Sequence, residues 1–332
     1  METFFIFLFI FLFNLTIYLK FEKISENLIF FDQPDGKLKK HLKPVSFIGG
    51  LIILVNLYLI VFFLKMLDLD NSIFENNFLY AFILLSTLFY FIGLIDDLKN
   101  LKPNIKLFFL FLSIILVIYF FPEIKLEHIK ISFLKSNYHF KYSAIFLVVS
   151  FALLANAMNM FDGINLQLIS FSSLLFILFI LKGFIPIFFI LLLVCFIFLA
   201  ILNFKNKVFL GDSGAYLISA VVGCTFIYQY DKFDNFFFGD EVFVILIIPA
   251  IDMLRLFFVR IINKKHPFKG DLNHFHHIVN NYTKNTSVTV FITITTSIIP
   301  IILLLLNINT YVVLILSLFI YFCLIAYLRF RV

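Results

Sequence analysis

Apolar residues occur in long runs along the whole chain, separated by short segments that hold most charged residues, glycines and prolines. A run of about 20 apolar residues can cross a bilayer as an α-helix. The pattern predicts an all-α, polytopic integral membrane protein with eleven transmembrane helices. Ten is the alternative count, because the polar run 156–167 leaves the neighbouring spans short. The predicted spans are 4–19, 45–64, 78–95, 104–121, 142–160, 166–181, 184–202, 214–230, 242–260, 288–306 and 311–328.

Composition agrees with this pattern, because 62% of the 332 residues are hydrophobic and only 14% are charged. Such a composition excludes a soluble globular enzyme. No block of basic residues suggests a nucleic-acid partner, and the three cysteines have no metal-type spacing. We expect one domain, residues 1–332, with the lipid bilayer as its surroundings.

Lysine and arginine set the predicted orientation. Alternate loops place 19 of the 26 basic residues on one side, which the positive-inside rule makes cytoplasmic. The N-terminus then lies outside and the C-terminus lies in the cytoplasm. The first run has Glu2 and no basic residue before it, so we read it as a retained helix and not a signal peptide.

Carboxylates and imidazoles from distant segments share the predicted cytoplasmic side. An acid in or beside a membrane span is costly, so it is a functional candidate by default. Their grouping at one surface predicts a single active site between helices. The contributing segments are near 20–44, 96–106, 155–167, 203–213 and 261–287.

Adjacent carboxylates end the third predicted span at Asp96 and Asp97, and Lys106 follows. Such a pair suits Mg²⁺, which is usually held by one or two carboxylates together with water and substrate phosphates. The pattern therefore favours a diphosphate substrate. A solvated helix end is the alternative interpretation.

Polar residues recur at every third position in Asn156, Asn159, Asp162 and Asn165, which predicts one polar helical face. Amide and carboxylate oxygens at such spacing can bind a metal, phosphate or sugar hydroxyls. Hydrogen bonds between membrane helices are the alternative explanation.

Two further motifs lie on the same predicted side. Asp212, between two glycines and before an apolar run, is expected either as a helix N-cap or where metal and phosphate meet first-turn N–H groups. His274 and His277 are expected on one helical face, with Lys269, in contact with phosphate or a nucleotide. A zinc site and an incidental surface cluster are the alternatives for the histidines.

Together these motifs resemble the polyprenyl-phosphate N-acetylhexosamine-1-phosphate transferase family, glycosyltransferase family 4, which includes undecaprenyl-phosphate N-acetylglucosamine-1-phosphate transferases and is related to phospho-N-acetylmuramoyl-pentapeptide transferases. The resemblance rests on five motifs in order, covering residues 32 to 277. They are Asp32-x-Pro34 with Lys40-His41 and Gly49-Gly50, Gly93-x-x-Asp96-Asp97, Asn156-x-x-Asn159-x-x-Asp162-Gly163, Phe209-Leu210-Gly211-Asp212-Ser213-Gly214, and Asp271-x-x-His274-x-His276-His277.

The resemblance implies an Mg²⁺-dependent enzyme of the bacterial cytoplasmic (inner) membrane, with Mn²⁺ as the alternative metal. Its expected reaction transfers a sugar 1-phosphate from a UDP-sugar to undecaprenyl phosphate, releases UMP at the cytoplasmic face and starts a lipid-linked cell-envelope glycan. It also implies a homodimer. The first expected donor is UDP-N-acetylglucosamine or a modified UDP-N-acetylhexosamine.

Residue roles follow from the same resemblance. Expected catalytic residues are Asp96, Asp97 and Asp162; expected metal ligands are Asp97, Asn159 and Asp212; expected substrate-binding residues are Lys40, His41, Lys106, Asn156, Asp271, His274, His276 and His277.

The chain departs from the family pattern at Asn165, where an aspartate is common, and at Leu272, where arginine is common. The early basic motif contains lysine in place of arginine, and lysine cannot grip phosphate in the bidentate way. A catalytically degenerate homologue is therefore one alternative, and a membrane transporter is another. A transporter predicts inverted repeats and acids at the bilayer midplane, and the sequence has neither.

Overall fold

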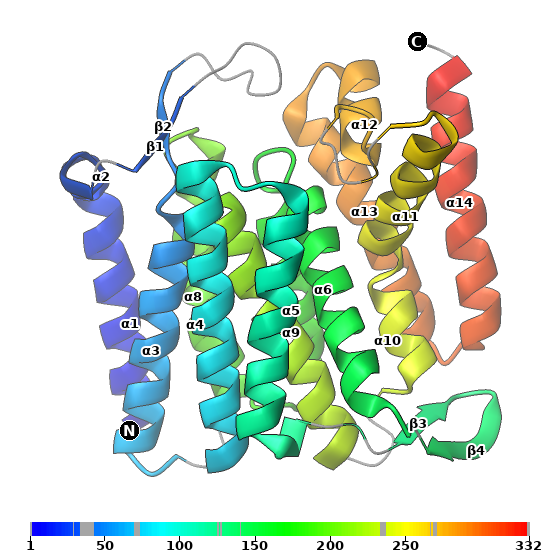
Figure 1. The fold of residues 1–332 in the computed structure, drawn as a ribbon. Helices are drawn as coiled ribbons and strands as arrows, with labels where there is room; N and C mark the ends of the chain where they lie inside the picture. The colour runs from blue at the N-terminus through cyan, green and yellow to red at the C-terminus, as the bar shows by residue number, and fades with distance from the viewer. Residues whose placement is uncertain are drawn as a thin grey trace. The chain divides into compact units, whose positions relative to one another are not determined.

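The computed structural model describes residues 2–28, 30–33, 43–69, 74–124, 126, 128–139, 141–232, 237–265, 267 and 271–330. The chain divides into two compact units: unit 1 contains 1–124 and 168–224, and unit 2 contains 125–167 and 225–332. Both units are built mainly from helices, which Figure 1 labels in chain order. The all-α class is therefore confirmed, and the single catalytic domain stays a prediction.

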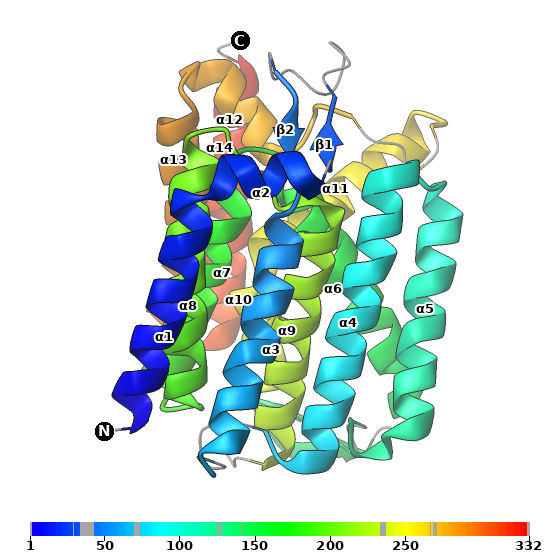
Figure 2. The same cartoon turned by 90° about the vertical axis from the view of Figure 1, so that its left-hand side faces the viewer.

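Unit 1 begins with α1 (Glu2–Leu19) and the short helix α2 (Phe21–Leu28), which lies across the end of α1 in Figure 2. Helix α1 packs against α8 and α3, while α4 packs against α5. A two-stranded antiparallel ribbon joins β1 to β2. The remaining elements are β1 (Phe31–Asp32), β2 (Val45–Ser46), α3 (Gly49–Met66), α4 (Asn76–Lys99), α5 (Pro103–Phe120), η2 (Pro122–Ile124), α7 (Gln167–Leu181, from its second residue), α8 (Pro186–Phe204) and the first part of α9 (Gly211–Lys232).

Unit 2 contains a hairpin, a long helix and a group of C-terminal helices. Helix α6 packs against α11, while α13 packs against α12 and α14. Helices α10 and α11 are bent by 76° at their junction. The elements are β3 (His128–Ile131), β4 (Leu134–His139), α6 (Ser143–Phe161), the end of α9, α10 (Gly239–Ile245), α11 (Ile247–Ile262), α12 (Phe275–Thr283), α13 (Thr286–Leu305) and α14 (Thr310–Phe330).

Within the described residues, eight helices are long and apolar enough to span a membrane, or nine if the bent pair α10 and α11 forms one span. The eight are α1, α3, α4, α5, α6, α8, α13 and α14. Two further predicted spans correspond to α7, which has 15 residues, and to α9, which has 22. The polytopic membrane class is confirmed, while the count of eleven and the orientation stay predictions.

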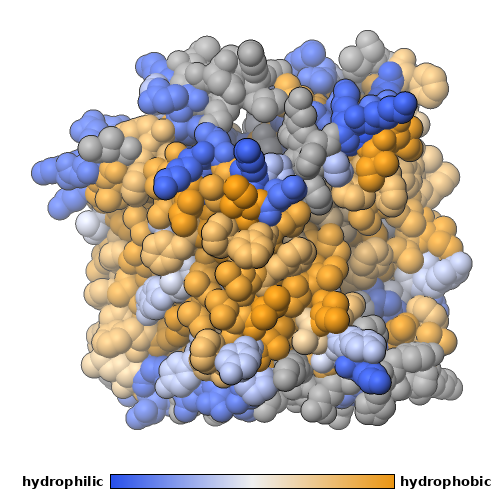
Figure 3. Space-filling view, viewed as in Figure 1, coloured by the Kyte–Doolittle hydropathy of each residue, from blue (hydrophilic) through white to orange (hydrophobic). Residues whose placement is uncertain are grey.

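Apolar side chains remain exposed on these helices. In unit 1, Phe91 of α4 is 50% exposed and Phe108 of α5 is 60% exposed. Figure 3 shows apolar side chains covering this face, with hydrophilic residues gathered near the helix ends. A soluble protein rarely exposes so large an apolar surface, and lipid chains solvate it at no such cost.

Two buried asparagines connect α1 and α3 inside unit 1. The Asn14 amide donates to the Asn56 carbonyl oxygen at 2.7 Å, and the Asn56 amide donates back at 3.1 Å. Each amide also donates to a carbonyl one turn earlier in its own helix. Reciprocal amide bonds of this kind hold membrane helices together where the hydrophobic effect cannot.

Replacing either asparagine by leucine is expected to lower the free energy of unfolding by about 1 kcal/mol, because the remaining amide loses its partner. Asn14→Leu combined with Asn56→Leu should cost less than the two single changes added together. Detergent-titrated unfolding followed by circular dichroism measures this. Thr16→Val, which breaks only a bond within α1, is the control. Additive effects would contradict the prediction.

Candidate functional site

A tight turn between α4 and α5 creates the first polar cluster of unit 1. Helix α4 ends because Asn100 adopts a left-handed conformation, with φ of 48°. Helix α5 starts at Pro103, three residues after Asn100, because the fixed φ of proline suits the first position of a helix. Lys106, in the first turn of α5, is thereby brought beside the acids at the end of α4.

Asp96 is buried, with 2% of its surface exposed, and it is paired on both sides. One carboxylate oxygen accepts a hydrogen bond from the Leu101 N–H at 2.8 Å, and the other forms an ion pair with the Lys106 ammonium. Lys106 Nζ also lies 3.4 Å from Asp212 Oδ2. One lysine therefore joins two carboxylates from different helices, which offsets the cost of burying their charges.

Asp97 caps the start of α9. Its Oδ1 accepts from the Asp212 N–H at 2.8 Å, and its Oδ2 accepts from the Ser213 N–H at 3.1 Å. Gly211 has φ of +72°, and a Cβ there would lie 2.6 Å from Asp97 Oδ2, so only glycine fits. The expectation that Asp212 is the N-cap is wrong, because Asp212 lies inside the helix and a carboxylate from α4 takes that place.

Helices α3 and α4 approach the start of α9 backbone to backbone. A Cβ at Gly93 would lie 2.4 Å from Ser213 Cα, and a Cβ at Gly50 would lie 2.6 Å from the Gly214 nitrogen. The Gly50 N–H donates to the Leu210 carbonyl at 3.1 Å. Three glycine-containing sequence motifs therefore meet at one point because any side chain would separate them.

The cluster has the chemistry of a divalent cation site. The Lys106 ammonium is paired with Asp96 and Asp212, and Asp97 binds the backbone beside Asp212. Asp212 is more open than Asp96, with 29% of its side chain exposed against 1%. Among the described residues, no group of three or more His, Cys, Asp or Glu side chains is arranged to hold a metal. Mg²⁺ needs only one or two protein carboxylates when substrate phosphates supply the rest, so the donors of Asp97 and Asp212 fit it.

In unit 2, the predicted polar face of α6 is shorter than expected. Helix α6 ends at Phe161, so Asp162 is its C-cap and Asn165 lies in the following turn. The prediction that all four polar residues share one helical face is wrong beyond Asn159. The Asn156 side-chain amide donates to the Ala152 carbonyl at 2.7 Å, within its own helix.

Three imidazoles meet at the start of α12. His274 precedes the helix, while His276 and His277 lie in its first turn. The rings of His274 and His276 are parallel, with centroids 5.5 Å apart, and the centroids of His276 and His277 are 4.2 Å apart. His274 is the N-cap and not part of the helix, and its ring centroid lies 6.3 Å from that of His277, three positions later.

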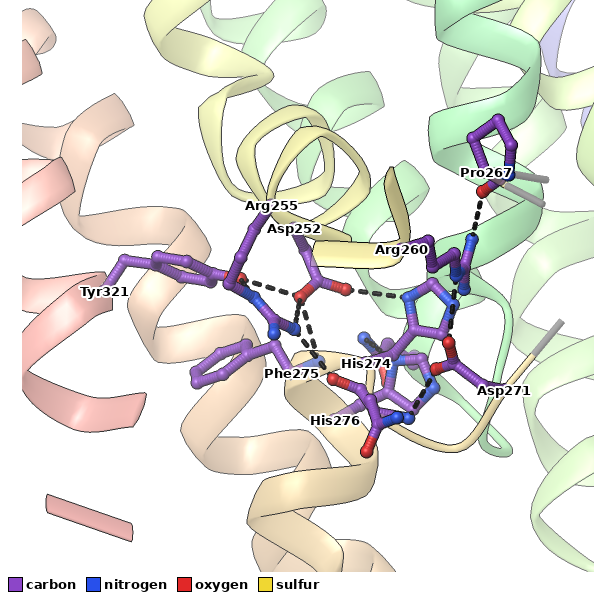
Figure 4. A network of polar contacts seen from close by, with 11 residues as sticks. Asp252, Arg255, Arg260, Pro267, Asp271, His274, Phe275, His276 and Tyr321 are labelled. Carbon is purple, nitrogen blue, oxygen red and sulfur yellow. Dashed lines mark hydrogen bonds and ion pairs between the residues drawn. The ribbon is translucent and has the colours of Figure 1, made fainter. Parts of the chain in front are cut away.

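A buried network on α11, drawn in Figure 4, escaped the sequence analysis. Asp252 is 3% exposed. Its Oδ2 lies 2.9 Å from His274 Nδ1, and its Oδ1 accepts from the Phe275 N–H at 3.0 Å. The same Oδ1 accepts from Tyr321 Oη and from Arg255, each at 2.7 Å. The available signal was an acid and an arginine three residues apart within a predicted span.

Arg260 and Asp271 form a second ion pair in unit 2. Arg260, 2% exposed, donates through Nε to Asp271 Oδ2 at 2.9 Å and through Nη1 to the Pro267 carbonyl at 2.8 Å. Burial alone would raise the pKa of Asp271, but hydrogen bonds from Arg260 and the Asn273 N–H outweigh it and lower that pKa below its ordinary value. Asp271 is therefore occupied with Arg260, and its predicted contact with substrate stays a prediction.

The ring of His276 packs against the backbone of Gly163. A Cβ at Gly163 would lie 1.9 Å from His276 Nε2, so the ring rests directly on the glycine backbone. Nδ1 of His276 lies 3.4 Å from Gln167 Nε2, and Nε2 is buried without a hydrogen-bond partner. Burial, followed by the adjacent His277 and His274, holds the pKa of His276 well below its ordinary value, so the ring is neutral.

The predicted residues thus fall into two groups. Asp96, Asp97, Lys106 and Asp212 meet in unit 1, whereas Asn156, Asn159, Asp162, Asp271 and the three histidines belong to unit 2. Lys40 and His41 lie outside the described residues. The functional role of each residue stays a prediction.

Comparison with known proteins gives a consistent result. Residues 79–230 match the family model described as Glycosyl transferase family 4. The chain is also similar to undecaprenyl-phosphate alpha-N-acetylglucosaminyl 1-phosphate transferase of Thermotoga maritima. The two are 29% identical over 259 residues, which cover 75% of this chain and 72% of the relative. The match to the family model contains Asp96, Asp97, Asp162 and Asp212.

Gly93→Ala is expected to lower the free energy of unfolding by about 1–3 kcal/mol, because the new methyl group meets the backbone of Ser213 and α4 must shift away from α9. Thermal unfolding in detergent measures the loss. Ile95→Ala, at a 44% exposed position on the same helix, is the control. Equal stability of the two variants would show that the close approach is not required.

Acid is expected to destabilise the protein through His276. Its pKa is lowered in the folded state, so the unfolded chain binds the additional proton, and stability falls as pH falls below about 6.5. The slope approaches about 1.4 kcal/mol per pH unit for one proton.

His276→Gln removes this titration, so the difference in stability between wild type and variant should depend on pH between about 7 and 5. Unfolding measured at a series of pH values tests it. Parallel curves for the two proteins would contradict the assignment of a neutral, buried His276.

Proposed function

Because residues 79–230 match the model of glycosyl transferase family 4, we propose that this multi-pass membrane protein transfers a sugar 1-phosphate from a UDP-sugar to undecaprenyl phosphate. UMP is the second product. The observation that carries the proposal is the cluster in which Lys106 of α5 is paired with Asp96 of α4 and Asp212 of α9, while Asp97 of α4 binds the N–H of Asp212.

The reaction requires little covalent chemistry from the protein. A phosphate oxygen of the lipid attacks the β-phosphorus of the UDP-sugar, a new P–O bond forms, and the bond to the UMP oxygen breaks. The lipid phosphate is already an anion, so no phosphoenzyme is needed. The barrier is lowered mainly by positioning the two anions and by offsetting the charge on the phosphoryl oxygens.

The carboxylates of Asp97 and Asp212 would hold Mg²⁺, or Mn²⁺ in its place, with Asn159 as a further candidate ligand from the family resemblance. When bound, the cation supplies charge neutralisation at the phosphate oxygens. Asp97 is fixed for this task because both its oxygens already accept N–H bonds from α9. Lys106 is paired with Asp96 and lies 3.4 Å from Asp212, so it would place a positive charge near the phosphates.

Several finer assignments belong to this proposal. Asp162 orients substrate or metal, and the histidines, Asn156, Asp271, Lys40 and His41 contact phosphate or nucleotide. The enzyme lies in the bacterial cytoplasmic membrane with its active site toward the cytoplasm, as the distribution of 19 of 26 basic residues supports. The proposed donor is UDP-N-acetylglucosamine or a modified UDP-N-acetylhexosamine, the product starts a lipid-linked cell-envelope glycan, and the protein forms a homodimer.

Purified protein in detergent should release UMP when given undecaprenyl phosphate, Mg²⁺ and one member of a panel of UDP-sugars. Asp97→Asn and Asp212→Asn should each reduce turnover at least about 100-fold, and a chelator should abolish it. Glu123→Gln is the matched control, since it keeps the oxygen that accepts a hydrogen bond from Asn77.

Failure to release UMP from any donor, with folded protein, would count against the proposed function. Asn165→Asp then tests the alternative of a degenerate homologue, because it restores the carboxylate common in the family. Activity gained by that variant would identify a degenerate enzyme, and no gain would remove this explanation.

A further inference from the structure

Asp252 is a buried carboxylate to which neither the sequence motifs nor the proposed reaction gives a role. It lies in α11 among apolar residues, and its side chain is 4% exposed. A lone charge in such a place is expensive, so a retained acid must be paired and hydrogen-bonded. Its four donors come from α11, α12, α14 and His274.

The hydrogen bonds around Asp252 Oδ1 show that this oxygen acts only as an acceptor. Arg255 Nε donates to Tyr321 Oη at 2.9 Å, so the hydroxyl must donate its own proton onward to Asp252 Oδ1. Arg255 Nη2 donates to the same oxygen and to the Asn273 carbonyl, each at 2.7 Å. Arg255 forms an ion pair with Asp252, so the carboxylate has a charged partner within α11 itself.

The ionised Oδ2 decides the state of His274. Because it can only accept, His274 Nδ1 must carry a proton and donate at 2.9 Å. The ring therefore turns Nε2 away from Asp252. His274 and His276 lie side by side, yet among the described residues only the former is paired with a carboxylate.

We propose that Asp252 is a positioning residue that keeps a proton on His274 Nδ1, so that Nε2 is the nitrogen that meets a phosphate oxygen of the substrates and, in the protonated ring, donates to it. The proposal deepens the proposed function and rests on it for the identity of the phosphate. The two sources of that phosphate are the diphosphate of the UDP-sugar and the undecaprenyl phosphate. Tyr321, from the C-terminal helix α14, and Arg255 hold Asp252 in place.

Other charged groups around His274 do not replace this carboxylate. Arg255 on α11 is committed to Asp252, and Asp271 is committed to Arg260 and the Asn273 N–H. On α12 the neighbours are His276 and His277, and from α14 the neighbour is Tyr321. Asp252 is therefore the carboxylate that meets His274 Nδ1.

The first test reads the histidine directly and needs no enzymatic activity. The full chain is labelled with ¹⁵N-histidine, and His274→Gln identifies the His274 resonances. Wild-type His274 should carry a proton on Nδ1. Asp252→Asn should add a population with the proton on Nε2, because the amide can turn its NH2 group toward the ring, whereas Tyr321→Phe, which leaves the contact to Oδ2, should not.

Wild-type protein alone can overturn the proposal, even if Asp252→Asn does not fold. A neutral His274 with its proton on Nε2 would contradict the Asp252 contact. A folded Asp252→Asn protein whose His274 resonances show the wild-type tautomer alone would contradict it equally.

The second test uses UMP release and distinguishes the two phosphates. Asp252→Asn and His274→Gln should each raise KM for one substrate about tenfold and change kcat much less, and the double variant should be no worse than either. A raised KM for the UDP-sugar identifies its diphosphate, and a raised KM for the lipid identifies the lipid phosphate. Unchanged KM values for both substrates would overturn the proposal. If wild type is inactive with every donor, the proposed function fails while the ¹⁵N measurement still decides the role of Asp252.

Discussion

An ion in apolar surroundings must find an oppositely charged partner, and this requirement organises both units. Asp96 is buried against Lys106, Asp252 against Arg255, and Arg260 against Asp271. The pair of Asp96 and Lys106 joins α4 to α5. Arg255 and Arg260 also hold the segment before α12, through the Asn273 carbonyl and the Asp271 carboxylate. The helices themselves form because a backbone in a bilayer must make its hydrogen bonds internally.

Glycines allow the helices to approach closely enough for these contacts to form. Around the start of α9, the backbones of α3 and α4 come so near that any Cβ would overlap with main-chain atoms. Only this approach lets Asp97 of α4 reach two N–H groups of α9. Gly163 plays the corresponding part in unit 2, where the His276 ring rests on its backbone. Small residues therefore position the chemistry without contributing functional atoms.

The polar groups of the two units have different character. Unit 1 gathers carboxylates around one ammonium, an arrangement that suits a divalent cation and the phosphates it binds. Unit 2 gathers three imidazoles at the start of α12, next to two pairs of aspartate and arginine.

The sequence by itself determined the membrane class, the approximate bounds of most helices and the acids and histidines worth attention, because hydropathy and motif spacing are local properties. It did not determine which acid caps α9, where the polar face of α6 ends, or that Asp252 and Tyr321 lie beside His274. Asp252 and Tyr321 are 69 positions apart, and Asp97 and Asp212 are 115 apart. Only the tertiary structure decided these contacts, because a buried charge takes whichever partner the packing of distant helices brings within hydrogen-bond reach.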